Sequence, residues 1–217
     1  MTKQFAHFID QLAAAELPTA AYNQYAPVSS ANLIRRENLR LYLQQMQGLE
    51  PKILLVGEAP GYRGCRFTGV PFSSEFILLQ GLAEIDLFGA WRGYQKTDEC
   101  QQVWKEATAT ILWQVLMQLQ VIPLLWNAFP FHPFHGDCLL SNRAPTRQEL
   151  KIGRVFLTEL IDLFQPQLIV ALGNQAEITL KQMGIICPKV RHPANGGKQR
   201  FREGLETILK SSRLQLS

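Results

Sequence analysis

Three short apolar runs, separated by stretches with a helical pattern, constrain the fold of this chain more than any other feature. They read KILLVG at 52–57, PLLWNAF at 123–129 and QLIVALG at 167–173, and a shorter run, PKVRHP, follows at 188–193. Strands that are apolar throughout are typical of parallel sheets with both faces covered. Their alternation with helices therefore predicts a three-layer α/β/α fold.

Helices are expected in the segments before, between and after these runs. Ser29 or Ser30 is placed to cap the second helix, and Thr146 with Glu149 matches a capping box at the start of a long one. The expected helices span 2–16, 29–49, 74–88, 106–119, 146–164, 174–184 and about 197–211.

The composition excludes several classes of protein. No apolar run approaches the roughly 20 residues needed to span a bilayer, and the start MTKQFAHFIDQLAAAEL lacks the basic-then-apolar pattern of a signal peptide. We therefore expect a cytoplasmic monomer that does not bind membranes. Because no repeat or linker interrupts the sequence, we expect a single domain over 1–217 with an N-terminal helical extension over about 1–50.

The positions of the charges and of the cysteines indicate which ligands the chain could bind. The net charge is only +4, but basic residues gather in the stretch VRHPANGGKQRFR. Such a cluster fits a polyanion at one edge of the protein, and a solvated basic face explains it equally well. No C-x-x-C pair is present, so we expect no metal and no cofactor. Free buried thiols are expected at Cys65, Cys100, Cys138 and Cys187.

Polar side chains follow several of the predicted strands. Ligands of parallel α/β sheets bind beyond the carboxyl ends of the strands, so the residues after each run are expected to converge. These residues are 57–60, 127–130, 173–175 and 192–195. The glycine-rich loop after the first strand matches neither the dinucleotide fingerprint nor the P-loop, so phosphate binding does not explain it.

Three of these residues form, together with Phe72, a set that suits a flat base. The Asn127 amide matches the N–H and C=O of an imide edge, His192 can donate to an oxygen that gains negative charge, and Phe72 can stack on a ring. With Glu58, the set suits a pyrimidine flipped out of its stack. Taken singly, each residue also has an ordinary explanation: a loop carboxylate, an Asx turn, a hydrogen-bonded histidine or a core ring.

From about residue 50 onward the chain resembles the uracil-DNA glycosylase superfamily. GEAPG at 57–61 is similar to the first motif of that superfamily, and TGVPF at 68–72 to the segment with its base-stacking Phe. WNAFP at 126–130 resembles the middle motif, and RHPANGGKQRF at 191–201 resembles the second catalytic motif. NRAPTRQEL at 142–150 resembles a segment of the thermostable branch, and all the motifs occur in the expected order.

The resemblance implies a central four-stranded parallel sheet and hydrolysis of the N-glycosidic bond of a deaminated base in DNA. It implies that Asn127 reads the uracil edge, Phe72 stacks on the ring and His192 stabilises the departing uracil anion. It also implies a pocket lining that includes Gly57, Ala59, Gly61 and Tyr62, and DNA contacts by Arg191, Asn195, Gly196, Gly197, Lys198 and Arg200.

The chain departs from the best-known branch of the superfamily at two positions of the first motif, one of which is acidic in that branch. That branch has an Asp that positions water where this chain has Ala59, and a Tyr that bars thymine where this chain has Gly61. A branch with GE[AG]PG has Glu at the position of Glu58 but binds an iron–sulphur cluster through four cysteines that this chain lacks. Another branch has a carboxylate where this chain has Glu75. The candidate catalytic residues are therefore Glu58 and His192, with Glu75 in reserve.

The expected function is that of a DNA glycosylase acting on uracil or another deaminated base, the first step of base-excision repair. The alternatives are an inactive binder of flipped bases or single-stranded DNA, which Ala59 favours, and a hydrolase of free nucleosides. His132 and His135 are expected on a polar rim, with metal binding as the alternative. The segment 91–104, with two Trp and a Tyr, is either a DNA-contact surface or core.

Overall fold

The computed structural model describes residues 2–212, and strands alternate with helices along the chain as predicted. The strands are β1 (Ala21–Tyr22), β2 (Ile53–Gly57), β3 (Leu124–Asn127), β4 (His132–Pro133), β5 (Leu168–Leu172) and β6 (Lys189–Val190). The α-helices are α1 (Thr2–Ala14), α2 (Ser30–Leu49), α3 (Cys65–Thr68), α4 (Glu75–Gln80), α5 (Ala107–Gln118), α6 (Arg147–Phe164), α7 (Asn174–Gln182) and α8 (Lys198–Ser211). Two single-turn 3₁₀ helices are η1 (Ala83–Ile85) and η2 (Ala90–Arg92).

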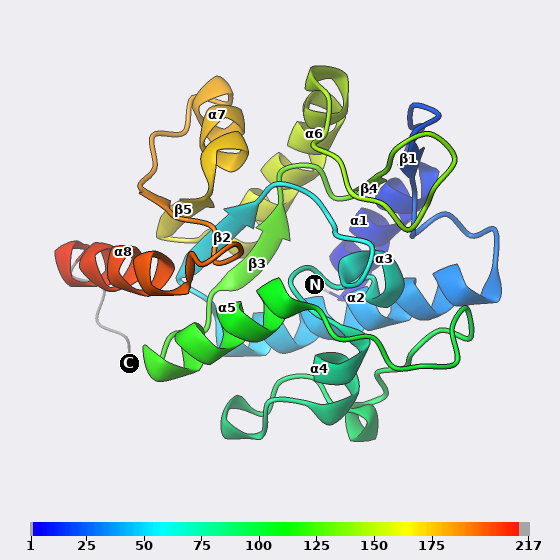
Figure 1. The fold of residues 1–217 in the computed structure, drawn as a ribbon, viewed down its shortest axis with the longest axis horizontal. Coiled ribbons are helices and arrows are strands. Elements are labelled where there is room, and N and C mark those ends of the chain that lie inside the picture. The colour runs from blue at the N-terminus through cyan, green and yellow to red at the C-terminus, as the bar shows by residue number, and fades with distance from the viewer. Residues whose placement is uncertain (1, 213–217) are drawn as a thin grey trace.

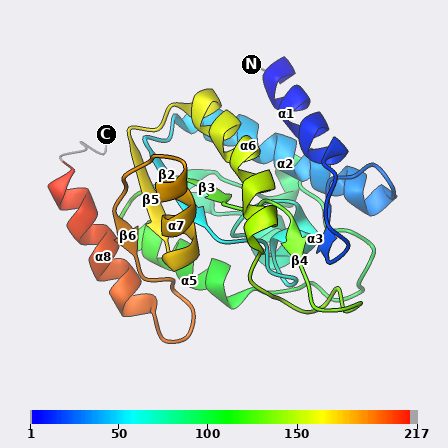
Figure 2. The same cartoon turned by 90° about the horizontal axis from the view of Figure 1, so that it is seen from above.

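The central sheet has four strands in the order β3-β2-β5-β6, and each neighbouring pair is parallel. Helices α6 and α7 lie above this sheet, and α2 and α5 lie below it (Figure 1). Seen from above, α7 covers β5 and α8 runs beside β6 at the edge (Figure 2). The predicted three-layer α/β/α fold with a central four-stranded parallel sheet is confirmed.

The two N-terminal helices pack on the strand that ends at Asn127. The ring of Phe8 in α1 lies 5.5 Å from that of Trp126 in β3, measured between centroids. From α2, the Tyr42 hydroxyl donates to Leu125 O at 3.3 Å and accepts from Leu125 N at 2.9 Å. Residues before the first sheet strand therefore belong to the same apolar core as the sheet. None of the helices in residues 2–212 combines the length and apolar character needed to cross a membrane.

The register of β2 and β3 brings two predicted site residues side by side. Gly57 is paired with Asn127 at the carboxyl ends of the two strands. The ladder continues past both strands, because Ala128 N donates to Gly57 O at 2.8 Å and Phe129 N donates to Glu58 O at 3.0 Å. Backbone hydrogen bonds therefore fix the start of both loops, which is where the site forms.

The helix predicted over 74–88 is shorter than expected. Helix α4 ends at Gln80 because Gly81 has φ +73°, a conformation that ends a helix and favours glycine. A Cβ on Gly81 would also lie 2.6 Å from the ring of Trp91. The prediction of one continuous helix over this stretch was wrong, since the chain turns at Gly81 and continues as a short 3₁₀ turn.

Two further features differ from the sequence predictions. All four cysteines are free, but only Cys65 is buried, so the expectation of buried thiols was wrong for Cys138, which is exposed, and for Cys100 and Cys187, which are partly exposed. Strands β1 and β4 form a separate antiparallel pair that was not predicted. Each has two residues, which is too short for an apolar pattern to be read.

Helix α6 approaches the chain after β3 closely at Gly153. A Cβ on Gly153 would lie 2.0 Å from Ala128 O and 2.9 Å from Phe129 Cα. Both of these atoms belong to backbone that is held by the extended ladder, so they cannot easily move. The glycine therefore sets how near α6 can come to the loop that follows Asn127.

We predict that Gly153→Ala destabilises the protein by about 1–3 kcal/mol, because the methyl group overpacks a rigid contact. The control is Gly48→Ala in α2, where a Cβ has no atom within 4 Å. Alanine favours helix more than glycine does, so this variant should gain roughly 0.5–1 kcal/mol. Urea unfolding measures both values, and stabilisation by both substitutions would contradict the proposed contact.

Candidate active site

A cavity of about 350 Å³ opens at the carboxyl edge of the sheet. Its walls come from the segment between β2 and α4, the last residue of β3, the loop after β6, the start of α5 and the segment before α6. Predicted site residues and residues that the sequence analysis did not identify both line it. They are Glu58, Ala59, Pro60, Gly61, Gly64, Cys65, Phe72, Ser73, Glu106, Thr108, Asn127, Asn142, Arg143, Ala144 and His192.

Gly57 lies beneath this cavity and lets two of its side chains come together. A Cβ at this position would lie 2.3 Å from Phe72 Cζ and 2.9 Å from Asn127 Oδ1. The Phe72 ring and the Asn127 amide therefore occupy the space that a larger residue would fill. This explains why the strand ends in glycine: the missing side chain lets a ring and an amide face the same space.

Phe72 is held in an unusual backbone conformation. Its φ of +50° lies in the left-handed region, which bulky residues rarely adopt and which costs on the order of 1–3 kcal/mol. Its carbonyl oxygen accepts a hydrogen bond from Trp113 Nε1 in α5 at 2.9 Å. Anchoring by α5 and packing against Gly57 therefore keep the ring at the cavity wall in spite of the strain.

Glu58 presents a carboxylate to the cavity. Its Oε1 atom is shielded from solvent and accepts no hydrogen bond within residues 2–212. Burial raises the pKa of this carboxyl group above its ordinary value. A carboxylate that is partly desolvated and unpaired is costly for stability, and such groups are concentrated at functional sites.

A hydrogen bond to His192 indicates which of its ring nitrogens carries the hydrogen. Its Nδ1 atom accepts from Ala194 N–H at 3.2 Å, so a neutral ring carries its hydrogen on Nε2. Burial lowers the pKa of His192, Glu106 opposes this shift and Arg191 adds to it. The neutral form is therefore favoured at neutral pH, and Nε2–H is the donor that this cavity-lining ring has left for a ligand.

Glu106 and Asn142 line the cavity but were not identified from the sequence. The Glu106 carboxylate caps α5 by accepting from Thr108 N at 2.9 Å and from Ala109 N. Asn142 Oδ1 accepts from Tyr62 N at 2.9 Å and so ties the segment before α6 to the first loop. The sequence feature that could have pointed to Glu106 is its position as a helix cap. For Asn142 it is its place in NRAPTRQEL.

Besides Gly57, two of the predicted catalytic and base-binding residues lie outside the cavity lining, Glu75 and Tyr62. Glu75 begins α4 and is fully buried, and its Oε2 accepts from the backbone N–H of Trp104 at 3.0 Å. Tyr62 follows the lining residue Gly61, and its ring packs edge-on against Trp104 with 6.4 Å between centroids. The structure thus brings Glu58, Phe72, Asn127 and His192 together and leaves Glu75 and Tyr62 beside them.

The basic segment 191–200 contains His192 and runs from the loop after β6 into the first turn of α8. Arg191, Asn195, Gly196, Lys198 and Arg200 are exposed. Gly197 is instead buried. A Cβ there would lie 2.1 Å from His192 O, and its N–H donates to Ala194 O at 3.0 Å. Its position indicates that it shapes the loop from within.

His132 does not lie on a polar rim as predicted, because it is fully buried. Its Nδ1 lies 2.9 Å from Pro60 O and its Nε2 lies 3.0 Å from Leu139 O. Both ring nitrogens therefore face carbonyl oxygens. Within residues 2–212, no group of three or more His, Cys, Asp or Glu side chains is arranged to hold a metal ion.

We predict that Gly57→Ala destabilises the protein by about 1–3 kcal/mol, because Phe72 and Asn127 must both move. Gly61→Ala is the matched control, since the nearest atoms to its Cβ, in the Asn142 amide, would lie 3.9 Å away. Its effect should stay within about 0.5 kcal/mol. Thermal unfolding followed by circular dichroism measures the difference, and equal melting temperatures would argue against Gly57 as the constraint.

Comparisons with known proteins agree with the fold. The crystal structure of wild-type SMUG2 from Pedobacter heparinus matches with a TM-score of 0.66 and 14% sequence identity, over 97% of each chain. At this low sequence identity, the structural match shows a shared fold and nothing more. None of the curated proteins matches the chain. The family model described as the uracil DNA glycosylase superfamily matches residues 44–213, most of the sequence. The chain therefore belongs to the uracil DNA glycosylase superfamily.

Proposed function

We propose that this protein removes uracil from DNA by hydrolysing its N-glycosidic bond. Membership in the superfamily implies DNA glycosylase activity on damaged bases. The choice of uracil rests on one observation: a single cavity is lined by an amide, an aromatic ring, a neutral histidine donor and an unpaired carboxylate. These four groups match the edge and the face of a pyrimidine, the base oxygen that gains negative charge as the bond breaks, and the sugar.

Recognition of the base is assigned to Asn127 and Phe72. Asn127 is 3% exposed and ends a buried strand, so its amide has a fixed position at the cavity. One amide oxygen and one amide N–H fit the N3–H and O4 of uracil, whereas cytosine presents an acceptor and a donor in the reverse order. The strained Phe72 gives the ring a flat surface to stack on.

Bond cleavage is assigned to electrostatic stabilisation. As the C1′–N1 bond breaks, its electron pair passes to uracil and the sugar becomes cationic. His192 Nε2–H then donates to the uracil oxygen that gains charge, and the Glu58 carboxylate faces the sugar and orients a water molecule. The water oxygen bonds to C1′ and its proton passes to Glu58. This division of roles needs a neutral His192 and an ionised Glu58.

Binding of the DNA backbone is assigned to the surface around the cavity mouth. Arg191, Lys198 and Arg200 are exposed beside His192 and can contact phosphates on both sides of a flipped nucleotide. The tip of the loop at Asn195 and Gly196 has φ values of +53° and +73°, so it turns sharply and projects. A projecting tip suits insertion into the minor groove of the opened strand.

A catalytically inactive binder is the second candidate. Ala59 lines the cavity and cannot ionise, and in the best-known branch of the superfamily the corresponding residue is the Asp that positions water. Release of uracil from an oligonucleotide distinguishes the two, because a binder forms a complex and leaves the glycosidic bond intact. The test is to incubate the purified protein with a uracil-containing oligonucleotide and reveal abasic sites with alkali.

We predict that Glu58→Gln lowers the rate of uracil release by on the order of 10²-fold, because the amide cannot balance the charge of the sugar. The matched control is Glu75→Gln, whose carbonyl can still accept the Trp104 N–H outside the cavity. That variant should keep a rate close to that of the parent protein. Single-turnover measurements compare them, and equal rates in all three proteins would remove the carboxylate from the mechanism.

The pH profile gives a second readout of the same substitution. Because burial raises the pKa of Glu58, the parent rate should fall with decreasing pH at a higher pH than an ordinary glutamate would give. Since Gln does not titrate, the ratio of parent rate to Glu58→Gln rate should shrink as the pH falls through that pKa. A ratio that stays constant would assign the acid limb to another group.

We predict that Asn127→Asp weakens discrimination between uracil and cytosine. The carboxylate loses the N–H that pairs with uracil O4 and offers only acceptors, and cytosine presents a donor at that position. Release of uracil should fall by on the order of 10²-fold, since an acceptor then faces an acceptor. Parallel assays on uracil and cytosine oligonucleotides measure the ratio, and an unchanged ratio would contradict base reading by Asn127.

A further inference from the structure

A second carboxylate lines the cavity besides that of Glu58. Glu106 is the residue directly before α5, and it lines the same cavity as His192. Its side chain packs closely against the loop after β2, because a Cβ on Gly64 would lie 3.3 Å from Glu106 Cγ. Glu106 therefore forms part of the cavity wall as well as the end of a helix.

The Glu106 carboxylate has a fixed position. Its Oε1 accepts from Thr108 N at 2.9 Å and its Oε2 accepts from Ala109 N, both in the first turn of α5. These donors and the positive end of the helix dipole stabilise a negative charge at this position. Glu58 differs, because its Oε1 accepts no hydrogen bond within residues 2–212. Glu106 is therefore less suited than Glu58 to bind and orient a water molecule.

Helix capping alone does not explain a glutamate at this position. The residues preferred at an N-cap are Ser, Thr, Asp and Asn, whose short side chains reach the N–H groups of the first turn. Ser29, Ser74 and Thr146 cap α2, α4 and α6 in this way. Among the side-chain N-caps of the described chain, Glu106 alone is charged, and it alone lines the cavity.

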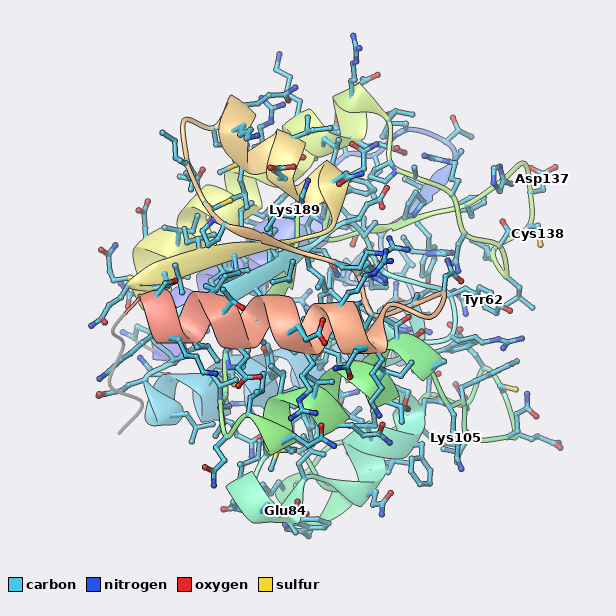
Figure 3. The ribbon with its side chains drawn as sticks, turned by 60° about the vertical axis from the view of Figure 1, so that its left-hand side comes forward. Tyr62, Glu84, Lys105, Asp137, Cys138 and Lys189 are labelled. Carbon is cyan, nitrogen blue, oxygen red and sulfur yellow. The ribbon has the colours of Figure 1, made fainter. Side chains whose placement is uncertain are left out.

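The charge of Glu106 is not neutralised by a neighbouring cation. Within residues 2–212, no basic side chain forms an ion pair with it. The preceding Lys105 is exposed and points outward at the surface (Figure 3), and its Nζ lies 4.2 Å from the centre of the Phe76 ring. Arg143 lines the cavity, but its guanidinium is held by Glu149. The negative charge of Glu106 can therefore act on whatever the cavity binds.

The charge of Glu106 extends across the cavity to His192. It raises the pKa of the His192 ring and so opposes the lowering caused by burial and by Arg191. Lys198 Nζ, in the first turn of α8, donates to Gln114 Oε1 in α5 at 3.1 Å. This contact keeps α5 beside the segment that carries His192. A nucleotide bound in the same cavity would lie within reach of the same charge.

The depth of Glu106 in the cavity matches that of a sugar. A flipped nucleotide enters base first, so the base reaches the buried end at Asn127, which is 3% exposed. Glu106 is partly exposed and therefore lies nearer the mouth. The sugar, which stays attached to the strand outside, remains at that level.

We propose that Glu106 stabilises the cationic sugar through its fixed negative charge, while Glu58 orients the water. This inference rests on the proposed function. As the C1′–N1 bond breaks, the electron pair leaves with uracil and the sugar becomes positive. A negative charge at the level of the sugar therefore stabilises the transition state more than the intact nucleotide. Glu106 forms no bond and takes up no proton, so its contribution depends on charge alone.

The test uses two variants that differ in charge but not in capping. Asp and Asn have nearly the same shape and cap helices about equally well, so Glu106→Asp and Glu106→Asn should have similar melting temperatures. Single-turnover release of uracil should be roughly 10- to 100-fold slower for Glu106→Asn, as expected for unit charges about 6–10 Å apart in a partly buried site. Equal rates, or a faster Asn variant, would overturn the proposal.

The affinity for DNA separates a charge effect from a lost contact. Loss of a negative charge should leave the affinity of Glu106→Asn for a labelled uracil oligonucleotide equal to or higher than that of Glu106→Asp, because phosphates are repelled less. Weaker binding by the Asn variant in fluorescence anisotropy would contradict a role through charge. The control is Glu206→Gln, which removes a negative charge that pairs with Lys210 on α8 and should keep the parental rate.

Failure of the proposed function gives a different result. If the parent protein releases no uracil, the glycosylase assignment fails, and the charge of Glu106 is tested at His192 by NMR. The His192 ring should titrate at lower pH in Glu106→Asn than in Glu106→Asp, because a neutral amide does not stabilise the charged ring. Equal midpoints would exclude Glu106 as a source of charge in the cavity.

Discussion

The pairing of β2 with β3 is the constraint on which the site depends. It sets Gly57 opposite Asn127, and its continuation beyond the strands fixes the backbone that carries Glu58. Because Gly57 has no side chain, the Asn127 amide and the Phe72 ring can meet above it. One short stretch of parallel ladder thus positions the amide and the ring proposed to bind the base, together with the Glu58 carboxylate. Helix α6 packs closely on that stretch at Gly153.

The charges of the site are separated between the cavity and its mouth. Glu58 and Glu106 place carboxylates at the cavity wall, and Arg143 is the one lining side chain in the described chain with a permanent positive charge. That guanidinium is occupied by both oxygens of Glu149, at 2.6 and 2.7 Å. An acidic interior favours a cationic sugar and disfavours a phosphate, whereas exposed cations such as Arg191 suit the backbone outside.

The fold was largely predictable because its signals are local and periodic. The apolar runs gave three of the four sheet strands within one or two residues at each end, and Thr146 with Glu149 forms the capping box that was predicted at the start of α6. The short elements were not predictable: α3 and the β1–β4 pair contain too few residues to show a period. The helix over 74–88 was overextended because tertiary contacts at Gly81 decide where it ends.

The site was predictable only where it follows a strand. Glu58, Asn127 and His192 could be grouped because parallel strands end at one edge. Glu106 and Asn142 come from irregular segments before helices, so nothing in their local sequence shows that they reach the same cavity. Likewise, the sequence could not show that Glu75 supports Trp104, since that contact joins residues 29 positions apart.

The buried ring of His132 lies between the carbonyl oxygens of Pro60 and Leu139, which belong to two different segments beside the cavity. Burial lowers the pKa of His132, so the ring is neutral and carries one hydrogen, yet carbonyl oxygens of Pro60 and Leu139 face its two nitrogens. Whichever tautomer forms, the ring donates a hydrogen bond to only one of these two carbonyl oxygens. The first-strand loop and the segment leading to Asn142 therefore compete for a single ring hydrogen.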